Sequence, residues 1–163
     1  MPTRRNVLSG VIGLAAAASL GKAAEKYDGP VPQKHDVPYL MHGDTLIETE
    51  SVAATQAASK GDTVFTVAGV TSPAKTPLAE PIFLFVSERI APTTLGLYQF
   101  DVKNGRREIV IPKKKSGSSK VFHTSIKQLS QVLVRLEASE YLENGEYCLS
   151  PEGENIAFCF TVI

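Results

Sequence analysis

Two histidines and two aspartates lie close together in the stretch HDVPYLMHGD. His35, Asp36, His42 and Asp44 carry imidazole and carboxylate groups, which are common metal ligands. Their spacing matches no metal motif of defined geometry, and the alternative is that they are polar residues of a surface loop. His35 and His42, with the nearby acids, are therefore a candidate metal site.

Other patterns that carry chemistry are missing from the sequence. It contains no G-x-S-x-G element of a hydrolase, no Gly-rich phosphate loop and no C-x-x-C pair. The residues after Cys159 include no His or Met, so a blue-copper site is excluded. The sequence thus favours a non-catalytic protein without a cofactor, although a triad can assemble from distant residues.

Positive charge gathers in one segment. Between positions 103 and 120 there are seven basic residues and one acidic residue, Glu108. Five of them form a candidate binding surface for a partner protein or an anionic polymer of the cell envelope: Arg106, Arg107, Lys113, Lys114 and Lys115. The alternative is that they are solvated hairpin tips, where lysines also discourage strand-to-strand aggregation.

The N-terminus, MPTRRNVLSG, begins with two adjacent arginines followed by an apolar run. Residues 3–8 resemble the twin-arginine export signal of bacteria, with Arg4 and Arg5 as the paired arginines. The apolar run is too short to span a bilayer, and small residues near position 23 suit a cleavage site. The resemblance implies a signal peptide at 1–23, recognition by the twin-arginine export machinery and a periplasmic or secreted protein.

Charge and length constrain the exported part. The chain has 17 basic and 17 acidic residues, and cleavage would remove Arg4, Arg5 and Lys22 but no acid, leaving a net charge of −3. That balance argues against a nucleic-acid partner. No later stretch approaches the about 18 apolar residues of a membrane span, so no transmembrane anchor is expected.

Prolines and alternating apolar residues divide the remainder into two parts. Three prolines predict an extended leader at 24–44, because proline excludes regular helix. From 45 to 163 the pattern predicts a β-domain, with a doubly buried strand at 81–88 and a tight Asn104-Gly105 hairpin. Residues 48–60 suit either a strand or an Ala-rich helix.

The last two strands carry both cysteines. Folding EYCLSPEGENIAFCF about its central Gly-Glu places Tyr147 opposite Phe160 and Leu149 opposite Phe158 on one apolar face. The same register sets Cys148 opposite Cys159 on the other, outer face. In an exported protein this predicts a cross-strand disulfide, and the alternative is two buried thiols.

Residues 142–147, LENGEY, resemble the tyrosine corner of immunoglobulin-like sandwiches. There a tyrosine hydroxyl hydrogen-bonds to backbone upstream, and here Tyr147 would do so with Gly145 in the turn. The resemblance and the spacing of the strands predict an all-β, antiparallel immunoglobulin-like sandwich of about seven to nine strands. The function expected from the sequence is an exported, non-catalytic sandwich that binds a partner protein or an anionic envelope component. The alternative is a small periplasmic metal-binding protein that uses the leader residues.

Overall fold

The computed structural model describes residues 26–113 and 120–163, and within these ranges the chain is built from β-strands. The strands form three sheets, and the described part contains one helical element, the 3-10 turn η1 at Pro92–Thr94. Strand pairing is antiparallel except between β6 (Lys75–Thr76) and β15 (Ile156–Val162). The prediction of an all-β chain with packed antiparallel sheets is confirmed. The described residues form fifteen strands instead of about seven to nine, because several long strands bend and continue in a second sheet.

Sheet A contains five strands, with β7 at its centre. In spatial order they are β12 (Thr124–Gln128), β13 (Leu133–Ala138), β7 (Ile82–Val86), β1 (Tyr39–His42) and β2 (Thr45–Glu48). β7 is apolar throughout and buried on both faces, as its sequence predicts. β1 lies in the stretch expected to be an extended leader, so the last part of that stretch belongs to the sheet instead.

Sheet B contains six strands and lies between the other two sheets. Its order is β11 (Val121–Phe122), β8 (Leu95–Gln99), β14 (Gly145–Pro151), β15 and β3 (Glu50–Ala53), and β6 pairs with β15. The register of β14 and β15 is the one predicted, with Tyr147 opposite Phe160 and Cys148 opposite Cys159.

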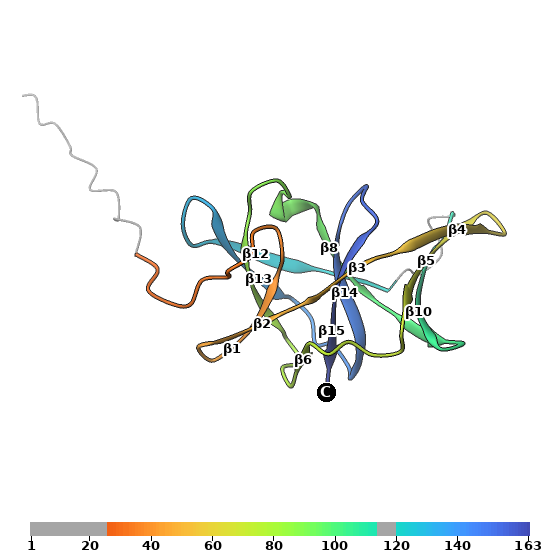
Figure 1. The fold of residues 1–163 in the computed structure, drawn as a ribbon, viewed down its shortest axis with the longest axis horizontal. Helices are drawn as coiled ribbons and strands as arrows, with labels where there is room; N and C mark the ends of the chain where they lie inside the picture. Colours follow the sequence, from red (N-terminus) through yellow and green to blue (C-terminus); the bar gives the residue numbers. More distant parts are fainter. Residues whose placement is uncertain (1–25, 114–119) are drawn as a thin grey trace, which may run out of the picture.

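Sheet C contains four strands and projects to one side of the molecule (Figure 1). Its order is β4 (Thr55–Ser59), β5 (Asp62–Ala68), β10 (Arg106–Ile111) and β9 (Asp101–Lys103). β3 and β4 account for most of the segment 48–60, which resolves its ambiguity in favour of strands.

Long strands bend from one sheet into the next and so join the layers. β2 continues through Thr49 into β3, and β11 continues through His123 into β12, so sheets A and B are connected along both edges. β3 bends at Ala54 into β4, and β8 bends at Phe100 into β9, so an edge strand and an inner strand of sheet B continue in sheet C. The backbone N–H of Ala54 donates to the carbonyl of Asn155 at its bend.

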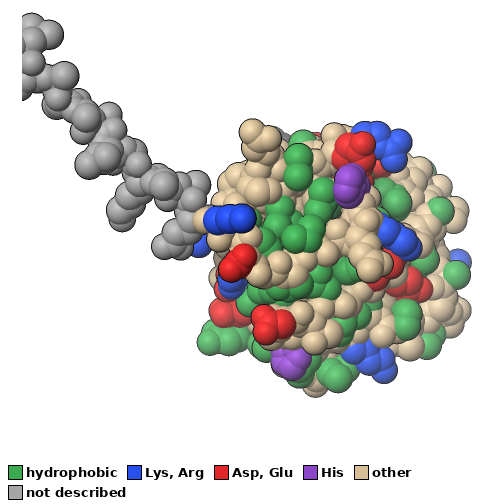
Figure 2. All heavy atoms as spheres, turned by 60° about the vertical axis from the view of Figure 1, so that its left-hand side comes forward, with side chains coloured by type: hydrophobic (Ala, Val, Ile, Leu, Met, Phe, Trp, Pro, Cys, Tyr) green, Lys and Arg blue, Asp and Glu red, His purple; other side chains and the backbone are tan. Residues whose placement is uncertain are grey.

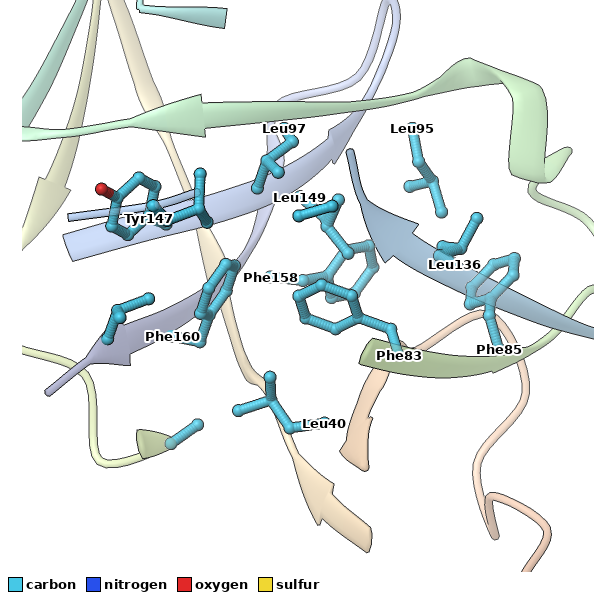
Figure 3. Packing of buried hydrophobic residues seen from close by; sticks show 14 of the residues in the cluster. Leu40, Phe83, Phe85, Leu95, Leu97, Leu136, Tyr147, Leu149, Phe158 and Phe160 are labelled. Atoms are coloured by element: carbon cyan, nitrogen blue, oxygen red, sulfur yellow. The ribbon is translucent and has the colours of Figure 1, made fainter. Parts of the chain in front are cut away.

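The main core lies between sheets A and B (Figure 3). Because side chains alternate along a strand, one face of β14 and β15 supplies aromatic and leucine side chains to this core. Phe160 packs edge-on against Phe83 with 5.0 Å between ring centroids and stacks on Tyr147 at 5.7 Å. The four residues predicted to share this face, Tyr147, Leu149, Phe158 and Phe160, are all buried.

The hydrogen bond expected of a tyrosine corner is present. The hydroxyl of Tyr147 donates to the carbonyl oxygen of Glu143 at 2.7 Å. Gly145 does not occupy a left-handed turn position: it is the first residue of β14 and pairs with Val162. The hydrogen bond predicted for Tyr147 is present, whereas Gly145 begins a strand.

The turn at Asn104-Gly105 joins β9 and β10 as predicted, with φ of 52° and 74°. Its simple two-residue loop sets Asp101 directly opposite Glu108, a pairing of like charges that a bulge would avoid. The structure neutralises each carboxylate instead. Lys120 pairs with Asp101 at 2.8 Å, and Arg106 pairs with Glu108 at 2.7 Å.

Candidate functional site

An apolar cleft of about 220 Å³ lies between sheets B and C. The inner face of sheet C is apolar because β5 and β10 alternate in register: Phe65 faces Ile109 across the pair. Sheet B supplies the opposite wall through the face of β14 and β15 that does not enter the main core. The walls comprise Phe65, Val67, Ile109 and Ile111 from sheet C and Tyr98, Cys148 and Ala157 from sheet B.

The turn between β14 and β15 borders the cleft. It contributes Glu152 and Glu154, both exposed, on either side of Gly153, which takes a φ of 81°. Burial raises the pKa of Tyr98 above its ordinary value, with smaller contributions from Cys148 and Glu152. Within the described residues the Tyr98 hydroxyl makes no hydrogen bond. The cleft therefore combines apolar walls with a few polar groups at its rim.

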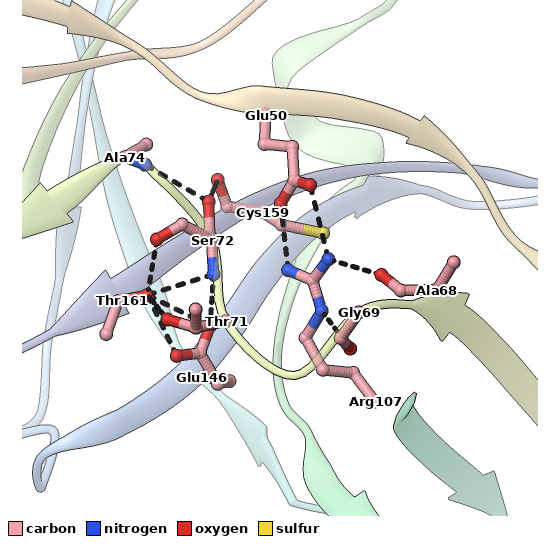
Figure 4. Close-up of polar contacts among 10 residues, drawn as sticks. All are labelled: Glu50, Ala68, Gly69, Thr71, Ser72, Ala74, Arg107, Glu146, Cys159 and Thr161. Atoms are coloured by element: carbon pink, nitrogen blue, oxygen red, sulfur yellow. Dashed lines mark hydrogen bonds and ion pairs between the residues drawn. The ribbon is translucent and has the colours of Figure 1, made fainter. Parts of the chain in front are cut away.

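A buried polar cluster joins sheets B and C deeper in the molecule (Figure 4). The Arg107 side chain is 1% exposed and forms a two-bond pair with the Glu50 carboxylate at 2.8 and 3.2 Å. Its remaining bonds go to the carbonyls of Ala68 and Gly69. Burial alone lowers the pKa of Arg107, but the Glu50 carboxylate, together with Cys159 and Glu146, outweighs this and the net direction is upward.

A second part of the cluster holds the crossing chain at residues 69–74. The Glu146 carboxylate accepts bonds from the Ser72 backbone N–H and the Thr161 hydroxyl, each at 2.9 Å. No buried side-chain nitrogen or oxygen of the described ranges lacks a hydrogen-bond partner. Because its polar atoms bond to one another and to backbone groups of different strands, this cluster holds sheets B and C together.

The prediction of a disulfide is wrong. Cys148 and Cys159 occupy opposite positions as expected, but both are free thiols and both are buried. The predicted outer face is covered by sheet C, and Figure 4 shows the Cys159 sulfur directed toward the Arg107 guanidinium. Register sets backbone positions and leaves the side-chain rotamers open. Burial raises the pKa of Cys148 well above its ordinary value and that of Cys159 to about 12, so both remain in the unreactive thiol form.

The leader residues do not form a metal site. Within residues 26–113 and 120–163 no group of three or more His, Cys, Asp or Glu side chains is placed to hold a metal ion. His35 pairs with Glu88 before β1, whereas His42 lies at the far end of that strand. The Asp36 carboxylate is occupied by the backbone N–H groups of residues 88–90. The extended backbone of β1 thus separates the two histidines.

The basic residues are dispersed. Arg107 is buried, so its predicted place on a binding surface is wrong, and Arg106 is paired with Glu108. Lys113 is exposed and its backbone N–H donates to Asp62, while Lys114 and Lys115 lie outside the described residues. On the side that carries the leader, acidic and basic side chains are interspersed among hydrophobic ones (Figure 2).

Sequence reasoning missed the cleft, although a signal for it exists. Residues 107, 109 and 111 share one face of a strand, as do 65 and 67, and four of these five are apolar. The non-core face of the last hairpin brings Cys148, Cys159 and Ala157 together, flanked by the polar residues Glu146, Ser150 and Thr161. The apolar face of the strands at 65–67 and 107–111 needs a partner layer, and this part of the hairpin can provide one.

Comparisons with other proteins give no further assignment: no protein-family model, curated protein or solved structure matches the chain. In the described ranges there is no helix of the length and apolar character that crossing a membrane requires. The cleft is therefore the feature on which a functional proposal can be based.

Proposed function

We propose that the chain is an exported, non-catalytic binding protein that takes an apolar group of its ligand into the cleft between sheets B and C. The observation that carries this is the cleft itself, about 220 Å³ with mostly apolar walls. A dry cavity of about 150 Å³ lined by similar side chains holds benzene, so this volume suits one aromatic ring or a short alkyl chain. Ligand sites typically combine such walls with few polar groups.

Binding without catalysis fits the state of the polar side chains. The buried cluster around Arg107 and Glu146 uses its atoms to join the sheets, and both cysteines are protonated thiols. Binding of an anionic envelope component through the basic segment receives less support, because Arg107 is buried and Arg106 is paired. The cleft is the better-supported site for a partner or envelope component.

Export and the finer fold assignment are part of the same proposal. The match of residues 3–8 to the twin-arginine pattern supports a periplasmic or secreted location. The hydrogen bond from Tyr147 to the Glu143 carbonyl supports an immunoglobulin-like arrangement of sheets A and B.

Titration with 1-octanol tests the binding proposal, because this neutral alcohol has an apolar chain of suitable size. We expect saturable binding by isothermal titration calorimetry. Ala54→Leu at the rim and Ala157→Leu in the wall should each weaken it at least about tenfold by filling the space.

The control is Val110→Leu, which adds a methylene on the exposed face of sheet C, away from the cleft, and should leave binding unchanged. Circular dichroism establishes that each variant is folded. The proposal would be refuted if octanol showed no saturable binding. It would also be refuted if the folded Ala54→Leu and Ala157→Leu variants bound octanol as tightly as the unchanged protein does.

A further inference from the structure

We propose that the ligand of the cleft is a small cationic amphiphile, an alkyl or aryl ammonium whose apolar part enters the cleft while its charge lies beside Glu152 and Glu154. This inference rests on the proposed function and adds the chemical class of the ligand.

The first observation is the sign of the charge. Among the described residues that line the cleft there are two carboxylates, Glu152 and Glu154, and no Lys, Arg or His. Arg107 lies behind the wall and is neutralised by Glu50. A ligand in the cleft therefore meets negative charge at the rim, which favours a cation and disfavours an anion.

The second observation is that these carboxylates are uncommitted. Neither Glu152 nor Glu154 makes a side-chain hydrogen bond or ion pair within the described residues, and both are exposed. Tyr98, whose hydroxyl is also without a partner there, lies in the same cleft and has its pKa raised by burial and, to a smaller degree, by Cys148 and Glu152. An ammonium group has several N–H donors and can satisfy such acceptors together.

The third observation distinguishes a small molecule from a peptide. The backbone around the rim is already hydrogen-bonded: Glu152 N–H donates to Thr94, Glu154 N–H to Pro151, and Ala54 N–H to Asn155. These N–H groups are not available for a main chain that would add as an extra strand. The cleft also has room for one apolar group only. Both features favour a free amine over a protein segment.

Three probes of equal chain length separate charge from apolar binding: octylammonium, 1-octanol and octanoate, titrated by calorimetry at pH 7 and low salt. Exposed ion pairs are weak, so we expect octylammonium to bind about two- to tenfold more tightly than octanol, and octanoate more weakly than octanol. Added salt should reduce the difference because exposed charges are screened.

The double variant Glu152→Gln/Glu154→Gln should bind the ammonium and the alcohol equally while keeping the affinity for octanol. Glu80→Gln/Glu143→Gln removes the same charge from exposed positions that do not line the cleft and should keep the preference. If octanol binds but octylammonium is not preferred, or if the preference survives in the double variant, the inference is overturned and the proposed function stands.

If none of the three probes binds, both the inference about the ligand's charge and the proposed function are overturned. Tighter binding of a short peptide with Lys next to an apolar residue than of octylammonium would also overturn the inference, because it would assign the cleft to a protein partner.

Discussion

Removing either partner of the ion pair between Arg107 and Glu50 should lower the free energy of unfolding, but by different amounts. The side chain of Arg107 is 1% exposed and that of Glu50 is 23% exposed. Removing the Glu50 carboxylate leaves a buried guanidinium without its hydrogen-bonded counter-charge, which typically costs about 3–5 kcal/mol. Removing the arginine leaves a carboxylate that can reach water, together with two carbonyls that lose their donor, at a cost of about 2–3 kcal/mol.

The assay is urea unfolding followed by circular dichroism, since the chain has no Trp. We expect Glu50→Ala to lower the free energy of unfolding more than Arg107→Met does. The double variant Arg107→Met/Glu50→Gln should cost clearly less than the sum of the corresponding single changes, because neither charge is left alone. The pair should persist at high salt, since buried charges are weakly screened.

Glu48 supplies the matched control. It pairs with Lys34 at 2.7 Å, but both side chains are well exposed, at 38% and 62%. Glu48→Ala should therefore cost less than about 1 kcal/mol. If Glu50→Ala lowers the free energy of unfolding no more than Glu48→Ala does, burial does not strengthen the Arg107–Glu50 pair between sheets B and C.

Tyr147→Ala should lower the free energy of unfolding by about 3–5 kcal/mol and Tyr147→Phe by about 0.5–1.5 kcal/mol, whereas Cys148→Ser should lower it less than Tyr147→Ala does. A reversed order in urea unfolding would contradict the tyrosine-corner assignment. Burial raises the pKa of Asp36, but three backbone N–H donors outweigh this, so the net pKa lies below the ordinary value. Asp36 therefore stabilises the fold above about pH 4, and this stabilisation is lost as the pH falls through the folded-state pKa. Asp36→Asn should make the free energy of unfolding depend less on pH in the acid range, and an unchanged dependence would contradict this. Arg4→Lys with Arg5→Lys should retain the precursor in the cytoplasm, and normal periplasmic protein on fractionation would exclude twin-arginine routing.

The last hairpin was predictable because its hydrophobic pattern specifies one register. A shift of one residue would turn Tyr147 and Leu149 out of the core, so the pattern alone selects the pairing that the structure has. The state of Cys148 and Cys159 was not predictable in this way. It depends on the layer that covers their face, and that layer comes from residues 62–68 and 106–111, far away in sequence.

Local charge also misled the assignment of Arg107. It lies in a basic segment, but its position in β10 places it on the same face as Ile109 and Ile111, opposite Val67. Strand periodicity therefore pointed inward while composition pointed outward, and periodicity was the better guide. The prediction of a metal site at His35 and His42 was wrong for a related reason. The two residues are close in sequence, but the extended strand β1 lies between them and keeps their side chains apart.

The ion pair between Arg107 and Glu50 and the apolar cleft lie at opposite ends of the interface between sheets B and C. Glu50 pairs in register with Cys159 near Arg107, whereas Ala53 pairs with Ile156, close to the turn that carries Glu152 and Glu154. Polar bonds with defined directions hold sheets B and C together at the first end, and at the other end apolar side chains face one another without filling the space. An entirely apolar interface gains free energy by closing such a space, since hydrophobic attraction has no preferred geometry. The hydrogen bonds between Arg107 in β10 and Glu50 in β3 fix how the two sheets meet at one end. We therefore expect the ion pair to oppose closure of the cleft at the other end.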